Sequence, residues 1–246
     1  MKHKESIIFG IHPVLEAVRS GKQIDKVLLR QGFKNEVTPG LIPALREQNV
    51  PFQYVPVEKL NRITTKNHQG IIALISEIEY TELEKLVPLL FEQGKTPSLA
   101  MLDGITDVRN LGAIVRSAEG AGLDAVIIPL KGSAQINSEA IKTSAGALNT
   151  LPVCRVSNLE ETLKYLRNSG FYVIGATEKA EKYIYDADMK QPVVMIMGSE
   201  DIGIDPKLMK AADILVKIPM MGAIQSLNVS AAASVLFFEM VRQRKQ

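Results

Sequence analysis

The sequence predicts an α/β protein with a mostly parallel sheet, preceded by a smaller α/β unit. Two observations support this prediction. From Ser98 onward, short apolar segments typical of buried strands alternate with helical segments, and such alternation gives a parallel sheet covered on both faces. Residues 7–80 contain similar segments in a shorter unit. An acidic stretch from Glu77 to Glu84 is followed by a predicted helix to about Gln93, and a boundary between the two parts is expected near residues 78–97.

Length and composition are those of an ordinary globular protein. The chain has 246 residues, 46% of them hydrophobic and 23% charged, and a net charge of +2, which allows one large or two modest domains. Its apolar runs are far shorter than the ~20 residues that span a bilayer, so no membrane partner is expected. Because Cys154 is the single cysteine, an intramolecular disulfide and a cysteine-cluster metal site are excluded. The first six residues hold no apolar leader, and we expect a cytoplasmic protein.

The first part of the chain is predicted to hold a short helix that starts near Pro13, with proline in its first turn. Strands are expected at residues 26–29 and 52–55, with a helix near residues 37–48 between them. Residues 70–75 form a continuous apolar run, which predicts a buried parallel strand.

The second part is predicted to hold regularly alternating strands and helices. The strands are expected at residues 98–102, 124–129, 171–175, 193–197 and 214–218. The helices are expected near residues 110–121, 137–147, 159–168, 206–212 and 227–243. Ligands of such sheets bind beyond the carboxyl ends of the strands, so the loops that follow the strands should carry the chemistry.

The first of these loops leads into Asn110, Gly112 and Arg116. Asn110 is a good N-cap for the helix that follows. Gly112 and Arg116 lie four residues apart and so share a helix face, and Gly112 has no side chain to block an approaching ligand or chain. By themselves these residues are better explained by a capped helix with one solvated arginine.

Two further loops carry polar residues next to glycines. The strand at 193–197 runs directly into Gly198, Ser199 and Glu200, but no Lys-Ser or Lys-Thr pair follows, which excludes a Walker A site. After the strand at 214–218, Ser226 is expected to cap a helix with Asn228 in its first turn. A helix start at Ser199 and a capped, tightly packed helix after Ser226 are the structural alternatives.

Together the three segments resemble, in order and spacing, the motifs of SpoU-type (TrmH family) RNA ribose 2′-O-methyltransferases of the SPOUT superfamily. Phe9-Gly10-Ile11-His12-Pro13-Val14 and His68-Gln69-Gly70-Ile71 are similar to the N-terminal RNA-binding extension of such enzymes. The resemblance implies an RNA substrate-binding domain at residues 1–78, a linker at 79–97 and a catalytic domain with a trefoil knot at 98–246. The layout is similar to that of enzymes that methylate a guanosine of 23S ribosomal RNA.

The resemblance also implies the site and its methyl donor. The donor would be S-adenosylmethionine, and the residues expected around it are Thr177, Gly198, Ile218, Met220 and Leu227. The expected catalytic residues are Asn110, Arg116, Glu200, Ser226 and Asn228. A homodimer is implied, with the active sites near its interface.

The chemistry of the expected reaction assigns a role to each group. No metal is expected, because the sulfonium group is already a good methyl donor and the three histidines lack carboxylates or cysteines at ligand spacing. An arginine stays protonated at neutral pH, so we expect Arg116 to hold the neighbouring phosphate and stabilise the developing alkoxide and not to act as a base. Glu200 is expected to orient Asn110 or Arg116.

RNA recognition is expected in the first part of the chain, with His12, His68 and Lys66 as contacts. The target hydroxyl is absent from DNA, which excludes DNA as the substrate. Three alternatives stay open: a tRNA 2′-O-methyltransferase, a ribosome-assembly factor without turnover, and a nucleotide-dependent oxidoreductase. A ribosome-assembly factor without turnover would be expected to lack Arg116 or Asn228. A nucleotide-dependent oxidoreductase would be expected to carry a G-x-G-x-x-G fingerprint, which this sequence lacks.

Overall fold

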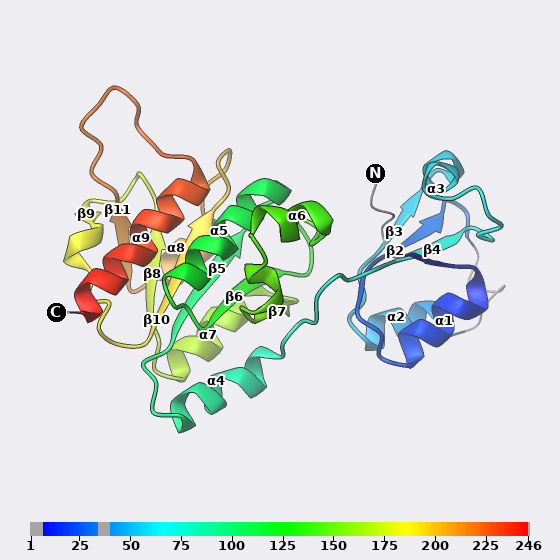
Figure 1. Cartoon of the computed structure of the whole chain (residues 1–246), viewed down its shortest axis with the longest axis horizontal. Helices are drawn as coiled ribbons and strands as arrows, with labels where there is room; N and C mark the ends of the chain where they lie inside the picture. The colour runs from blue at the N-terminus through cyan, green and yellow to red at the C-terminus, as the bar shows by residue number, and fades with distance from the viewer. Residues whose placement is uncertain (1–6, 34–39, 246) are drawn as a thin grey trace. The chain divides into compact units, whose positions relative to one another are not determined.

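The computed structural model describes residues 7–33 and 40–245, which form two compact units that divide mainly between Glu79 and Tyr80 (Figure 1). Each unit has its own sheet. The predicted helix near residues 37–48 is seen from Leu41, and residues 37–39 lie outside the described part. No helix among the described residues is long and apolar enough to cross a membrane.

Over its described residues, the first unit is a four-stranded sheet in the order β1-β4-β2-β3 with three helices. Its elements are β1 (Ile7–Phe9), α1 (Ile11–Arg19), β2 (Ile24–Arg30), α2 (Leu41–Glu47), β3 (Phe52–Val55), α3 (Val57–Ile63) and β4 (Ile71–Ile75). β1 and α3 are additions to the predicted elements, whereas the other strands and helices lie where they were expected.

The prediction that β4 is a parallel strand is wrong, because it pairs antiparallel with both β1 and β2. Its continuous apolar sequence has another cause. Ile71 and Ala73 are buried in a core that includes α1 and α2, while Ile72 and Leu74 are buried with Leu60 of α3 on the opposite face. The apolar run therefore indicated burial on both faces and not strand direction.

The larger unit holds a seven-stranded sheet in the order β7-β6-β5-β10-β8-β11-β9, and its neighbouring strands pair in parallel. Its strands are β5 (Ser98–Asp103), β6 (Ala125–Pro129), β7 (Val153–Val156), β8 (Tyr172–Ala176), β9 (Lys182–Tyr183), β10 (Val193–Gly198) and β11 (Ile214–Lys217). Its helices are α4 (Leu83–Glu92), α5 (Val108–Gly120), α6 (Ser138–Thr143), α7 (Leu159–Asn168), α8 (Pro206–Ala211) and α9 (Val229–Arg244), with 3₁₀ turns η2 (Ala147–Asn149) and η3 (Ile184–Asp186). The fold class is thus the predicted α/β type.

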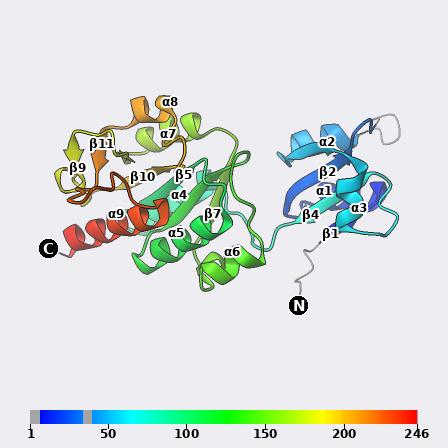
Figure 2. The same ribbon diagram turned by 90° about the horizontal axis from the view of Figure 1, so that it is seen from above.

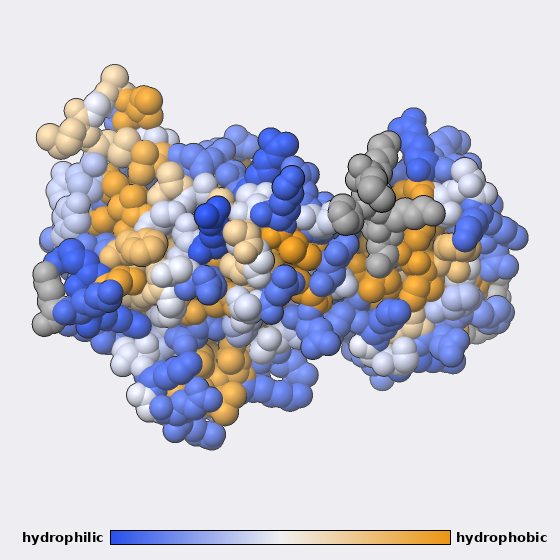
Figure 3. Space-filling model, in the orientation of Figure 1, coloured by the Kyte–Doolittle hydropathy of each residue, from blue (hydrophilic) through white to orange (hydrophobic). Residues whose placement is uncertain are grey.

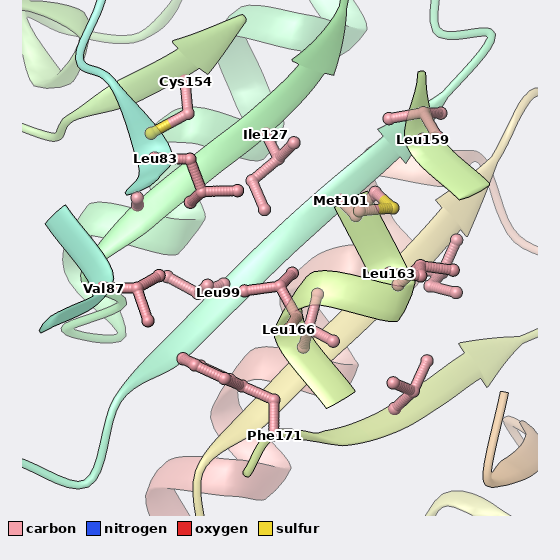
Figure 4. Close-up of a cluster of buried hydrophobic side chains, with 14 of the residues drawn as sticks. Leu83, Val87, Leu99, Met101, Ile127, Cys154, Leu159, Leu163, Leu166 and Phe171 are labelled. Atoms are coloured by element: carbon pink, nitrogen blue, oxygen red, sulfur yellow. The ribbon is translucent and has the colours of Figure 1, made fainter. Parts of the chain in front are cut away.

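Helices cover both faces of this sheet, with α5 and α9 on one side and α7 and α8 on the other (Figure 2). On the second side, leucines of α7 pack on β5 and β10 in a continuous core (Figure 4). Cys154 belongs to this core, and burial raises the pKa of its thiol to about 12, so it stays protonated. These layers leave the carboxyl ends of the strands for the loops that form the site.

Of residues 79–97, which the sequence predicts as a linker, residues 80–97 are part of the larger unit. Tyr80 bridges to Val153 of β7. Leu83, Val87 and Leu90 of α4 are buried against the sheet. Of the acidic residues at this boundary, Glu82 precedes the first residue of α4 and Glu84 lies in its first turn, and both are exposed.

Candidate active site

A cavity of about 480 Å³ opens where β8, β10 and β11 end at their carboxyl ends. This volume lies within the range of ordinary small-molecule sites. Its wall consists of the loops that follow these three strands and the start of α9. The five residues predicted for the donor all line it: Thr177, Gly198, Ile218, Met220 and Leu227.

The chemistry of this wall fits S-adenosylmethionine. Met197, Ile218 and Met220 supply apolar surface for a purine ring, whereas Glu178 and Glu200 supply carboxylates for hydroxyl groups or a cationic sulfur. The chain also turns back tightly on itself here: a Cβ atom on Gly198 would lie 2.2 Å from the backbone of Gly203. Only glycine therefore fits at the end of β10, and the cavity wall at this point is main chain.

Three loops from distant parts of the sequence meet at the carboxylate of Glu200. Its Oε1 accepts hydrogen bonds from Asn110 Nδ2 at 3.3 Å, from the backbone N–H of Val229 at 3.3 Å, and from Asn228 Nδ2. Asn228 Nδ2 also lies 3.1 Å from Asn110 Oδ1. The expectation that Glu200 orients Asn110 agrees with this network, which joins it to Asn228 as well.

The helices that carry these asparagines begin elsewhere than predicted. The predicted N-cap at Asn110 is wrong: the cap of α5 is Asp107, whose carboxylate accepts from the N–H groups of Arg109 and Asn110. Asn110 therefore lies in the first turn, and its amide is free to reach Glu200. The predicted cap at Ser226 is also wrong, because α9 is capped by Asn228, which accepts from Ser230 N at 3.0 Å.

Arg116 and Ser226 take no part in this network among the described contacts. Ser226 is exposed in the loop before α9 and lines the cavity. Arg116 is exposed on α5, off the apolar stripe as predicted, and neither it nor Asn110 belongs to the cavity wall. The next residue, Ser117, joins α5 to α9 through a 2.7 Å contact between its Oγ and that of Ser234.

Gly112 serves packing within the chain. A Cβ atom at this position would lie 2.8 Å from the carbonyl oxygen of Ala140 and 2.8 Å from Cβ of Thr143. The missing side chain therefore lets α5 and α6 approach each other. The expectation that it admits a ligand or another chain is wrong.

In the first unit, the two segments similar to an RNA-binding extension lie side by side. Gln69, which sequence reasoning did not single out, accepts from the N–H of Ile11 at 3.0 Å and adopts a left-handed φ of 54°. His12 and Lys66 are exposed, and Lys66 Nζ lies 5.7 Å from the ring centroid of Phe9. These groups present a cationic and aromatic surface.

His68, predicted as an RNA contact, is buried in the same unit. Its Nε2 lies 2.9 Å from Asn61 Oδ1, and its Nδ1 accepts from Gly70 N at 3.0 Å. Both ring nitrogens are thus engaged in hydrogen bonds, and the ring holds the loop in place. The structure gives His68 a supporting role and leaves the exposed surface to its neighbours.

Comparison with known proteins decides the family. The profile of the SpoU rRNA Methylase family matches residues 97–238, and a profile described as RNA 2′-O ribose methyltransferase substrate binding matches residues 7–81. The chain belongs to the SpoU rRNA methylase family. It is therefore an S-adenosylmethionine-dependent RNA 2′-O-methyltransferase of the TrmH/SpoU type.

Relatives of this family match along almost their whole length. A protein named for the TrmH family of tRNA/rRNA methyltransferases from Staphylococcus haemolyticus is 34% identical over 243 residues, which is 99% of this chain and 98% of the relative. One from Staphylococcus aureus is 35% identical over 243 residues, covering 98% and 97% of the two chains. Both units are therefore shared with these SpoU relatives.

Solved structures share the fold. The SpoU methyltransferase AviRb from Streptomyces viridochromogenes, in complex with AdoMet, is 24% identical with a TM-score of 0.62, covering 98% of this chain and 91% of that one. A structure described as an RNA 2′-O ribose methyltransferase is 26% identical with a TM-score of 0.57, covering 98% and 89%. The two-unit SpoU architecture thus extends over the whole described chain.

Proposed function

We propose that the chain methylates the 2′-hydroxyl of a guanosine in 23S ribosomal RNA. In this proposal, residues 98–246 form the knotted catalytic domain and the first unit binds the RNA substrate. The observation that carries the proposal is the convergence of Asn110, Glu200 and Asn228 beside the cavity at the strand ends. A match to a substrate-binding profile over residues 7–81 supports the role of the first unit.

The cavity residues bind and orient the donor in this proposal. When bound, S-adenosylmethionine supplies a methyl group that is already activated for transfer. The donor would be held by Thr177, Gly198, Ile218, Met220 and Leu227, and Ser226 lines the same cavity. Methyl transfer requires in-line placement of the hydroxyl and a 2′ oxygen made more nucleophilic as its proton leaves, so the residues of the site act by positioning the hydroxyl and by stabilising the charge on its oxygen.

Glu200 sets the positions of the two asparagines. Its carboxylate collects N–H donors from Asn110, Asn228 and the start of α9, so both amides are held in one orientation without solvent reorganisation. Asn110 Oδ1 accepts from Asn228 Nδ2 at 3.1 Å. The pair forms a fixed polar edge along which a ribose can be aligned.

Arg116 stabilises the oxygen that attacks. Its guanidinium remains protonated, so it holds the phosphate next to the target ribose and offsets the negative charge that develops on the 2′ oxygen. Because Arg116 is exposed on α5, the N–H donors of its guanidinium group are accessible to RNA.

The first unit presents the RNA through its exposed loop surface. His12 and Lys66 are the proposed contacts, while His68 holds the loop from beneath. A cation over the Phe9 ring beside exposed polar side chains suits unpaired bases and phosphates of a structured RNA loop.

We further propose that the protein acts as a homodimer. Val235 and Phe238 on α9 are 38% and 50% exposed. In the preceding loop, Met221 is 97% exposed and Ile224 72% exposed. Figure 3 shows apolar side chains gathered over α9 and this loop. Such a patch on a protein surface is typical of an interface.

Mapping ribose methylation tests the substrate. We expect deletion of the gene to remove one 2′-O-methylguanosine from 23S ribosomal RNA and leave the methylation of tRNA unchanged. Loss from tRNA alone would support the alternative that the names of the relatives include, a tRNA substrate. Unchanged methylation in both RNA classes would contradict the proposal.

A further inference from the structure

The loop that carries Glu200 is exposed at its tip and is buried in the core at its last residue, Ile204. It connects β10 to α8 over residues 199–204. Glu200, Asp201 and Ile202 are exposed, with Ile202 80% exposed at its tip. Within the loop, Gly203 N donates to Ser199 O at 2.9 Å and Ile202 N lies 3.3 Å from Ser199 Oγ. The position of Glu200 therefore depends on how the two ends of the loop are held.

Asp103, the last residue of β5, contacts the chain at both ends of the 199–204 loop. Its backbone is the ladder partner of Gly198, the last residue of β10 before the loop. Its side chain reaches past the loop, where Oδ2 accepts from the N–H of Asp205 at 2.7 Å. Asp205 caps α8 at the other end of the loop. One half-buried residue of a central strand thus ties together the entry and the exit of the Glu200 loop.

We propose that Asp103 is a positioning residue for methyl transfer, which fixes the 199–204 loop so that Glu200 receives the amides of Asn110 and Asn228. This inference rests on the roles proposed above for those three residues. Asp103 acts through the loop and needs no contact with donor or RNA.

The hydrogen bond, and not the negative charge, is the feature that this role requires. Burial raises the pKa of Asp103, the N–H of Asp205 lowers it, and the Asp205 carboxylate raises it again. The charge at this position is therefore placed unfavourably beside a second carboxylate. An asparagine would offer an equivalent acceptor oxygen without that repulsion.

A first pair of variants separates the hydrogen bond from the charge. Turnover is measured with labelled S-adenosylmethionine and a mixture of in vitro-transcribed 23S ribosomal RNA and tRNA, and donor affinity by calorimetry. Asp103→Ala should lower kcat about 10- to 100-fold, because a shift of the order of 1 Å in reacting groups has an effect of that size. Asp103→Asn should keep kcat within about threefold of wild type, and both variants should keep the donor Kd within about threefold.

A second pair removes the same hydrogen bond from the donor side. Asp205 has a φ of −52°, which proline adopts without strain. Asp205→Pro and Asp205→Ala both lose the carboxylate that caps α8, but only the proline lacks the N–H that Asp103 accepts. We expect Asp205→Pro to lower kcat as Asp103→Ala does, and Asp205→Ala to stay within about threefold of wild type.

The results that overturn the inference are distinct from those that overturn the proposed function. Wild-type kcat in Asp103→Ala, equal loss in Asp103→Asn, or equal rates in the two Asp205 variants would each reject the positioning role while leaving the site intact. Glu200→Ala serves as the reference in the same assay, because it removes the acceptor oxygen that a glutamine would keep. Wild-type turnover in Glu200→Ala would reject the proposed site, and the role of Asp103 with it.

Discussion

At the scale of single residues, Asn228 has two functions that can be separated chemically. Its Oδ1 caps α9 by accepting from Ser230, while its Nδ2 donates to Glu200 and Asn110. Asn228→Asp keeps the cap but places a carboxylate against that of Glu200. We expect kcat to fall about 100-fold or more because the polar edge is disrupted, while the melting temperature changes little. Wild-type turnover in this variant would contradict the role of the network.

Arg116 offers a second test at this scale. Arg116→Lys keeps the charge but loses the forked donors, so we expect kcat/KM for RNA to fall about 100-fold. The donor Kd should not change, because Arg116 lies outside the cavity wall. Arg109→Lys is the matched control on the same helix, since the exposed pair of Arg109 with Glu139 contributes little. Equal activities of the two variants would reject the phosphate-clamp role.

Candidate site residues could be named from the sequence, but their contacts could not. Glycines and asparagines after apolar strands indicated the loops, and the resemblance assigned their roles. The caps of α5 and α9 were misplaced because Asp107 and Asn228 are cap residues of the same quality as Asn110 and Ser226, and local sequence does not rank such neighbours. The burial of His68 and the link from Asp103 to Asp205 depend on tertiary packing.

At the scale of elements, α9 is anchored at its C-terminal half by a buried polar cluster. Gln243 accepts from Met189 N at 2.9 Å and donates to Ala187 O at 3.1 Å and Glu239 Oε1 at 2.8 Å. Glu239, only 7% exposed, also binds Arg242 through both carboxylate oxygens. This anchor fixes the helix whose first residues form part of the site.

The anchor should make the free energy of unfolding depend on pH. The hydrogen bond from Arg242 is the main cause that lowers the pKa of Glu239 from its ordinary 4.5, and burial opposes it. A lowered pKa stabilises the folded state above the unfolded pKa, and this stabilisation is lost as the pH falls through the folded value. Glu239→Gln should therefore lower the stability by about 1–2 kcal/mol at pH 7, and this difference should shrink as urea melts are repeated below pH 4.5. A constant difference across the pH range would contradict the account.

Helices and strands were predicted well where the spacing of apolar residues along the sequence matches the pattern of buried side chains in the structure. α7 lies at the residues expected, and the five predicted strands of the large sheet are present. β9 has two residues and β7 carries Arg155 between apolar residues, so neither gives a clear apolar run. The direction of β4 could not be predicted because a strand buried on both faces has the same sequence pattern in parallel and antiparallel sheets.

At the scale of the whole molecule, the apolar face of α9 predicts association. Phe238→Asp places a charge in the centre of this face, and we expect it to convert a dimer to a monomer in light scattering coupled to gel filtration. Because Phe238 is half exposed in the single chain, its substitution should leave the folded subunit intact by circular dichroism. A variant that still elutes as a dimer would place the interface elsewhere.

The central claim is that loops after three parallel strands enclose the methyl donor beside Glu200. A crystal structure of the full chain with S-adenosylmethionine tests this claim most directly. The account predicts the donor in the cavity formed by Thr177, Gly198 and Leu227, with Glu200 still bound to Asn110 and Asn228. A donor bound away from these strand ends, or a Glu200 side chain separated from both asparagines, would contradict it.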